Sequence, residues 1–249
     1  MEPIRRFIRP YCDLDPYARR ETDGFYAVRT LYLDSEDYKT YWDAQEEIPS
    51  RFKLRIRTYG RNAESFVKFE IKRHFNDVCY KTSVRANEEI WARLFATRNP
   101  QGIDLSPKTA NPAVQRFLGL AHAIDAEPKI LIQFERQAFQ SRTDRFVRIS
   151  FDRRICHHSR DAYDLKAYQM DWSFNEGSVY TGEPGPHIIL ELKMMAHPPI
   201  WLLDLIRRFG LVGRSSSKYR TAVTRVLKRE QIAREPSLSM AATPWEKRE

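Results

Sequence analysis

Cysteine is scarce in this sequence and shows no pattern typical of a disulfide framework or a zinc site. Only Cys12, Cys79 and Cys156 occur among 249 residues, and no two have CxxC spacing. A disulfide scaffold or a structural zinc site needs paired spacing. The cysteine content therefore argues against both classes, and we expect a reducing compartment.

Long apolar runs are also missing. No segment approaches the roughly 18 consecutive apolar residues of a transmembrane helix, and the opening stretch MEPIRRFIRP lacks the apolar core of a signal peptide. We therefore expect a soluble, cytoplasmic chain that does not insert into a membrane.

Acidic residues are too few to balance the basic ones. The sequence has 42 Lys and Arg against 33 Asp and Glu, which gives a formal net charge of +9. This balance favours an anionic partner such as nucleic acid, a nucleotide, polyphosphate or a membrane surface. The length, with 42% hydrophobic residues, suits one domain with its own core.

Alternation of apolar and polar residues predicts about seven strands. Short polar connectors such as NAES and QSRTD are typical of antiparallel hairpins. The alternating segments are 25–34, 51–60, 65–73, 79–85, 129–139, 145–152 and 187–195.

Helical spacing of apolar residues fills three of the gaps. Helices are predicted over 87–96, over 111–124, which opens with Asn111 and Pro112, and over 198–211, where Gly210 is the expected stop. The final SLSMAATPWEKRE has no period and is expected to be a loose tail. The predicted fold class is α+β with an antiparallel sheet.

The alternation puts cations on one face of several strands. In RFKLRIRTYG, Lys53, Arg55 and Arg57 share one face, and apolar residues share the other. Four further strands repeat this design, with Lys68, Glu70 and Lys72, then Lys81 and Arg85, then Arg148 and Asp152, then Glu191 and Lys193.

Two interpretations of these faces are open. They form either the solvated side of a sheet whose other side is covered by helices, or the lining of a closed barrel. An enclosed lining needs an anion, since burying unpaired cations costs several kcal/mol each. Glu70, Glu191 and Asp152 are too few to neutralise it, whereas a row of phosphates suits both guanidinium and ammonium groups.

An ordered series of motifs resembles the VTC domain, the polyphosphate polymerase branch of the CYTH-like triphosphate tunnel enzymes. The series covers about residues 20–225 and reads YAVRTLYLD, KLRIRTYG, KFEIK, YKTSVR, IQFERQAF, VRISFD, LELK, PPIW and SSSKYR. The resemblance implies an antiparallel β-barrel tunnel, usually of eight strands, with helices packed outside. It makes 1–225 a single tunnel domain and 226–249 a helix end with a flexible tail.

The resemblance also implies an activity. Family members transfer the γ-phosphoryl group of ATP to a phosphate or polyphosphate acceptor, with Mn²⁺ or Mg²⁺ as the divalent metal. Carried over, this makes Arg55, Arg57, Lys72 and Lys218 the expected catalytic residues. The expected phosphate contacts are Lys53, Lys68, Lys81, Arg85, Arg136, Arg148, Lys193 and Ser217. Glu191 and Glu70 are the expected metal ligands.

Several of these assignments have alternatives. Glu70 is otherwise a cross-strand ion-pair partner, and the serines of SSSKYR otherwise only cap a helix. Arg136 shares a face with the apolar Ile132 and Phe134, so its inward placement rests on the resemblance and not on alternation. Asp152 is expected to cap a turn after its strand, and Tyr32 and Asp34 are assigned no role.

The function also has alternatives, namely a tunnel triphosphatase and a non-catalytic module that binds polyphosphate or a nucleotide. Nucleic acid is disfavoured because the cation faces carry almost no aromatic residues. Family members often work beside membrane proteins, so a membrane-protein partner is compatible with the resemblance.

One departure concerns the first strand, which in the family usually resembles RYERK and is not found here. The chain opens on what resembles the end of the helix that follows that strand. Three explanations are open: a start assigned too far downstream, a truncated inactive relative, or a partner chain that supplies the strand. Competence as an enzyme depends on which of them holds.

Overall fold

One antiparallel sheet dominates the computed structural model. The structure describes residues 1–60, 66–76, 78–87, 91, 111–144, 146–166, 173–174, 188–195 and 197–234. The strands are β1 (Cys12–Leu14), β2 (Tyr26–Asp34), β3 (Ser50–Tyr59), β4 (Phe66–Phe75), β5 (Val78–Asn87), β6 (Glu127–Ser141), β7 (Arg148–Ser159), β8 (Ser173–Phe174) and β9 (Ile189–Lys193).

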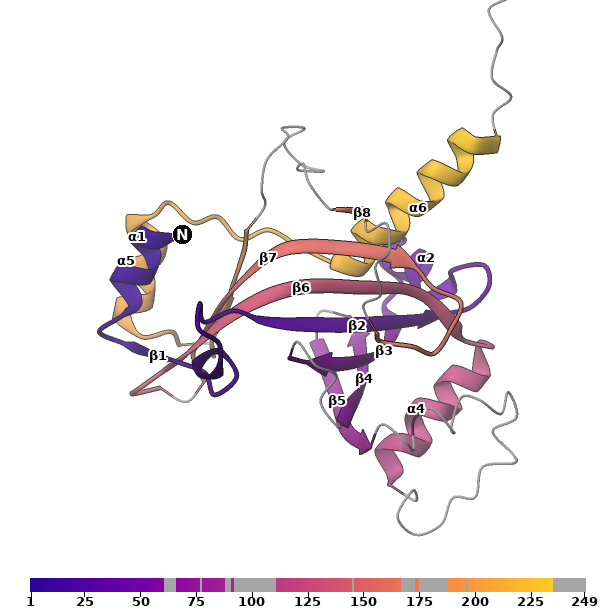
Figure 1. The fold of residues 1–249 in the computed structure, drawn as a ribbon, viewed down its shortest axis with the longest axis horizontal. Coiled ribbons are helices and arrows are strands. Elements are labelled where there is room, and N and C mark those ends of the chain that lie inside the picture. The colour runs from indigo at the N-terminus through magenta and orange to yellow at the C-terminus, as the bar shows by residue number, and fades with distance from the viewer. Residues whose placement is uncertain are drawn as a thin grey trace, which may run out of the picture.

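The sheet follows the order β5-β4-β3-β2-β6-β7, with β8 and β9 both paired to β7 and β1 paired to β6. The sheet curls into a half-barrel, and its curvature can be followed from β7 through β6, β2, β3 and β4 to β5 (Figure 1). Within the described residues, β5 and β9 each pair with one neighbour and not with each other. All seven predicted strands are present; β1 and β8 are too short to show alternation.

Two of the three predicted helices are confirmed. The α4 helix begins as expected, with Pro112 in the first turn and the Asn111 side chain accepting a hydrogen bond from the Ala113 amide at 2.9 Å. After α5 the chain turns through Gly210, whose φ is +55°. Of the helix predicted over 87–96, the structure describes only Asn87, which ends β5, and Trp91; the predicted tail lies outside the described residues.

The helices are α1 (Glu2–Ile8), α2 (Lys39–Gln45), α4 (Pro112–Ala123), α5 (Ile200–Arg208) and α6 (Lys218–Arg234), with a short 3₁₀ turn at Ala18–Arg20. The α6 helix runs beyond residue 225, where the tunnel domain was expected to end. No helix among the described residues is long and apolar enough to cross a membrane.

Three helices cover the outer face, which carries the apolar side chains of the alternating strands. The α4 helix packs over β2 to β5, where Phe117 stacks on Phe69 with ring centroids 5.0 Å apart. At the other end of the sheet, α1 and α5 pack together over β6, β7 and β9 (Figure 1). Helices on the outside are therefore confirmed.

The α6 helix differs, because it packs on the opposite, inner face. Tyr219 stacks on Tyr32 at 4.6 Å, and Ala222 and Val223 pack against Ile130 and Ile132 of β6. Here the inner face of β2 and β6 is apolar rather than cationic. The helix thereby brings Ser217 and Lys218 into the hollow of the sheet.

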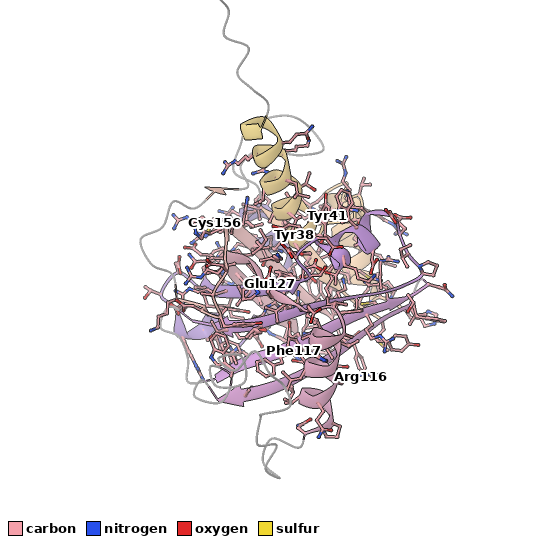
Figure 2. All side chains as sticks on the ribbon, turned by 90° about the vertical axis from the view of Figure 1, so that its right-hand side faces the viewer. Tyr38, Tyr41, Arg116, Phe117, Glu127 and Cys156 are labelled. Carbon is pink, nitrogen blue, oxygen red and sulfur yellow. The ribbon has the colours of Figure 1, made fainter. Side chains whose placement is uncertain are left out.

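We predict that Phe117→Ala lowers the free energy of unfolding by about 3 to 5 kcal/mol, because it leaves a cavity in the α4 contact. Phe117 is fully buried between helix and sheet, whereas the adjacent Arg116 is exposed (Figure 2). Arg116→Ala is the matched control and should change stability by less than about 0.5 kcal/mol. Urea unfolding measures the free energy of unfolding of both variants. Equal losses of stability in the two would contradict the assignment of Phe117 to the hydrophobic core.

Candidate active site on the inner face

Register aligns the cations of β3, β4 and β5 into rows across the inner face. One row is Lys53, Lys72 and Lys81, and another is Arg57, Lys68 and Arg85. The row between them is Arg55, Glu70 and Ser83. We call these seven cations and Glu70 the cation ladder. It concentrates positive charge around a single carboxylate.

Glu70 is enclosed by that charge. Its side chain is 1% exposed; Arg55 Nε lies 2.7 Å and Arg57 Nη1 3.7 Å from Oε2, and Lys81 Nζ lies 2.6 Å from Oε1. Burial alone would raise the pKa of Glu70, but Arg55, Arg57 and Lys81 outweigh it and lower the pKa to about 2. Glu70 is therefore ionised at any ordinary pH and orients both guanidinium groups.

Other inner-face groups complete the orientation of the two arginines. Arg55 Nη1 donates to the Tyr32 hydroxyl at 3.2 Å, and Arg57 Nε donates to Thr30 Oγ1 at 3.0 Å. The nearby arginines overcome the effect of burial and lower the pKa of Tyr32. The arginines are thus held in place before any ligand arrives.

Lys53 lies at the junction of the ladder and α6. Its Nζ contacts Ser217 Oγ at 3.4 Å and lies 5.6 Å from the centre of the Tyr219 ring. Burial is the largest cause that lowers its pKa to about 8; Tyr32 opposes that shift and Lys72 adds to it. Keeping the Lys53 ammonium group charged in the folded protein therefore costs free energy of folding.

A second cluster, which we call the Asp152 cluster, lies across the hollow on β6, β7, β9 and α6. Asp152 is fully buried and accepts from Arg136 Nε and Nη2 at 2.7 and 2.8 Å and from Lys218 Nζ at 2.7 Å. Burial opposes ionisation of Asp152, but hydrogen bonds from Arg136 and the charge of Lys218 lower its pKa. Glu191 Oε2 accepts from Arg136 Nη2 at 3.2 Å.

The prediction that Asp152 caps a turn is therefore wrong. The β7 strand continues to Ser159, and Asp152 lies within it opposite Arg136. Arg136 points into the hollow, as the family resemblance implied. Two cations that were expected to contact phosphate, Arg136 and Lys218, share the same buried carboxylate.

The start of α6 is anchored by Asp34 at the end of β2. This buried carboxylate accepts from the Tyr219 hydroxyl, from Thr40 Oγ1 at 2.7 Å and from the amides of Thr40 and Tyr41 at 2.8 and 3.1 Å. It thus ties α2 and α6 together. Because Tyr219 follows Lys218 directly, Asp34 fixes where Ser217 and Lys218 lie.

The structure brings most of the expected site residues to one face. The ladder holds the expected residues of β3, β4 and β5, and the Asp152 cluster holds Arg136, Glu191 and Lys218. Arg148 pairs in register with Lys193 on the same face, and Lys193 Nζ lies 3.3 Å from Glu191 Oε1.

Sequence reasoning gave no role to Tyr32 and Asp34. Both belong to the motif YLD at the end of a strand that precedes a helix, and this position is a signal for a residue that anchors the helix.

The two expected metal ligands differ in their surroundings. Both oxygens of Glu70 contact cations, which matches its alternative as an ion-pair partner. Glu191 is 38% exposed, so its carboxylate can face solvent and a ligand. Among the described residues, no three His, Cys, Asp or Glu side chains gather where they could hold a metal ion. Glu191 fits a metal that takes its other ligands from phosphate oxygens and water.

Comparison with known proteins identifies a family, a curated relative and solved structures that resemble this chain. The family model described as the VTC domain matches residues 1–227. A curated relative, the vacuolar transporter chaperone complex subunit 4 of Trypanosoma brucei brucei, is 25% identical over 67% of this chain, which spans 24% of that protein. A solved structure described as a putative adenylate cyclase from Bacillus halodurans aligns with a TM-score of 0.45 and 12% identity over 87% of this chain and 88% of that one.

We predict that Glu70→Gln lowers the free energy of unfolding at pH 7 by about 3 to 5 kcal/mol, because three cations lose a buried charged partner. The folded pKa of Glu70 is about 2 and the ordinary value is 4.5, so the stabilisation is complete above pH 4.5 and is lost as pH falls toward 2. The gap between wild type and variant in urea midpoint should narrow over that range. A gap independent of pH would contradict the ion-pair account.

We predict the opposite sign for Lys53→Met, which should raise the free energy of unfolding at pH 7 by about 1 to 2 kcal/mol. The folded pKa of about 8 lies below the unfolded value of 10.5, so the cost of Lys53 is complete below pH 8 and disappears as pH rises to 10.5. Thermal unfolding at pH 7 and pH 10 measures the difference. Exposed Arg6→Met is the control for loss of charge.

Proposed function

The chain belongs to the VTC domain family, and from this premise we propose that it transfers the γ-phosphoryl group of ATP to a phosphate or polyphosphate acceptor on the inner face. The observation that carries the proposal is the cation ladder, in which seven cations surround one carboxylate. Such an excess suits a ligand that carries several negative charges close together. Both ATP, the donor, and a phosphate or polyphosphate acceptor carry several negative charges close together.

Phosphoryl transfer asks a protein mainly for positioning and for stabilisation of charge on the transferring group. In our proposal Arg55 and Arg57 supply both, because Glu70, Tyr32 and Thr30 already hold them in place. Guanidinium donors that do not face these partners are left for phosphate oxygens. No reorganisation of these side chains is then needed during the reaction.

Two lysines supply ammonium charges, one exposed and one held by a carboxylate. Lys72 is exposed on β4 and can follow a phosphate along the ladder. Lys218 is directed into the hollow by α6 and held by Asp152 at 2.7 Å. We propose that Lys72 and Lys218 contact the transferring group from opposite sides of the hollow.

We propose that Glu191 holds a divalent ion, Mn²⁺ or Mg²⁺, together with phosphate oxygens. A bound ion of this kind neutralises charge on the phosphates. Glu191 is already ionised, because Lys193 and Arg136 outweigh its burial and lower its pKa.

Other subunits are part of the proposal as well. The trypanosome relative is named as a subunit of a complex. We propose by analogy that this chain also works beside other subunits.

The test is to incubate the protein with ATP and Mn²⁺ or Mg²⁺ and to separate polyphosphate from orthophosphate. We expect polyphosphate, and we expect Lys72→Gln to lower its formation by about a hundredfold without lowering stability, because this exposed amine contacts no carboxylate among the described residues. Arg6→Gln, with the same loss of charge on α1, should retain full turnover. Orthophosphate as the sole product would instead indicate a triphosphatase.

Glu191→Gln separates catalysis from binding. We expect turnover to fall and the affinity for tripolyphosphate without metal to stay within about threefold, since one exposed carboxylate is neutralised. Retained affinity together with no turnover in the wild-type protein would indicate a binding module and overturn the enzymatic proposal.

A further inference from the structure

The inner-face cations continue beyond the ladder, toward the start of β3. Arg51 pairs in register with His74, and both lie two residues from the Lys53 and Lys72 pair, so all four share the inner face. Arg220 adds a fifth basic group from α6. We call Arg51, Lys53, Lys72, His74 and Arg220 the basic mouth. Arg51, His74 and Arg220 were not expected to have any role.

These five groups act on one another electrostatically, and the Arg220 amide donates to Ser217 Oγ, the atom that Lys53 Nζ contacts. Besides burial, the charges of Lys72, Arg220 and Arg51 help to lower the pKa of Lys53. Burial likewise comes first in lowering the pKa of His74, followed by Lys72, Arg51 and Lys53. Three elements, β3, β4 and α6, therefore direct positive charge to one place.

Acidic side chains do not balance this charge. In the part of the chain that the structure describes, none of the five groups forms an ion pair with a carboxylate. Arg51 Nη1 donates to the Ile48 carbonyl at 2.8 Å, and Lys53 contacts Ser217. By contrast, Arg142 is paired with Asp13 and Arg153 with Glu135 elsewhere on the surface. The mouth thus lacks the counter-charge that these other basic groups have.

The mouth and the ladder form one track along the strands. From Arg57 to Arg51 is six residues of β3, which corresponds to about 20 Å. That distance is longer than a triphosphate group. A ligand that contacted the whole track would therefore be a longer chain of linked anions.

We propose that the basic mouth binds the continuing chain of a linear inorganic polyphosphate, beyond the phosphates that lie on the ladder. This inference rests on the proposed function and extends it to three further residues. Single-stranded RNA is a poorer fit, because its bases require exposed rings for stacking. Tyr219, the ring beside Lys53, is 1% exposed and already stacked on Tyr32.

The test compares a short and a long ligand on the full chain. The double variant Arg51→Gln/Arg220→Gln should weaken binding of long-chain polyphosphate about tenfold or more, because two charged contacts are lost. Binding of tripolyphosphate should change less than about threefold, since the ladder is intact. The control Arg6→Gln/Arg154→Gln removes the same charge from side chains that are 80% and 71% exposed elsewhere. Titration calorimetry at fixed salt measures the affinities.

Each outcome decides between the two proposals. An equal loss of affinity for both ligands, or an equal loss of affinity in the control variant, would contradict polyphosphate binding by the basic mouth and leave the proposed function standing. A wild-type protein that bound neither ligand would overturn both. Competition by single-stranded RNA as strong as that by polyphosphate would assign the mouth to nucleic acid instead.

Discussion

Repulsion between like charges on neighbouring strands is the constraint on which the inner face depends. Lys53, Lys72 and Lys81 lie directly opposite one another across three strands, and such pairs destabilise a sheet. The row between the two cationic rows contains the one carboxylate, and that carboxylate is buried. Glu70 therefore does two things at once. It offsets the repulsion that would push β3, β4 and β5 apart, and it orients the arginines that it pairs with.

The second constraint is the position of α6, which joins the two sides of the half-barrel. Asp34 fixes Tyr219, Tyr219 stacks on Tyr32, and Tyr32 accepts from Arg55 of the ladder. The preceding residue, Lys218, contacts Asp152 on the other side of the hollow. The chain of contacts is short and fully packed, so a shift of α6 would be felt by both clusters. This connection gives Asp34 a role in the site through Tyr219.

Local pattern predicted the strands well because alternation depends only on neighbours in sequence. All seven alternating segments are strands, and the faces of Arg55, Glu70 and Lys81 follow from counting by two. Alternation failed after Asp152, where Arg154 adopts a φ of +51° and the pairing of β6 with β7 shifts register. The docking of α6 was not predictable in this way, since Asp34 and Tyr219 lie 185 residues apart. The same kind of sequence separation concealed the pairing of Lys218 with Asp152.

Charge compensation divides the inner face into two parts with different chemistry. In the Asp152 cluster, a buried carboxylate already occupies donors of Arg136 and Lys218, so a phosphate that used those donors would have to displace it or share them. Displacement would leave a fully buried carboxylate without its partners, which costs several kcal/mol. Phosphate binding to the cation ladder needs no such displacement, because the ladder has seven cations and Glu70 contacts three of them. The first phosphate contacts should therefore form on β3, β4 and β5. Lys218 should join them afterwards by sharing its charge between Asp152 and the phosphate, while Arg136 stays paired with Asp152.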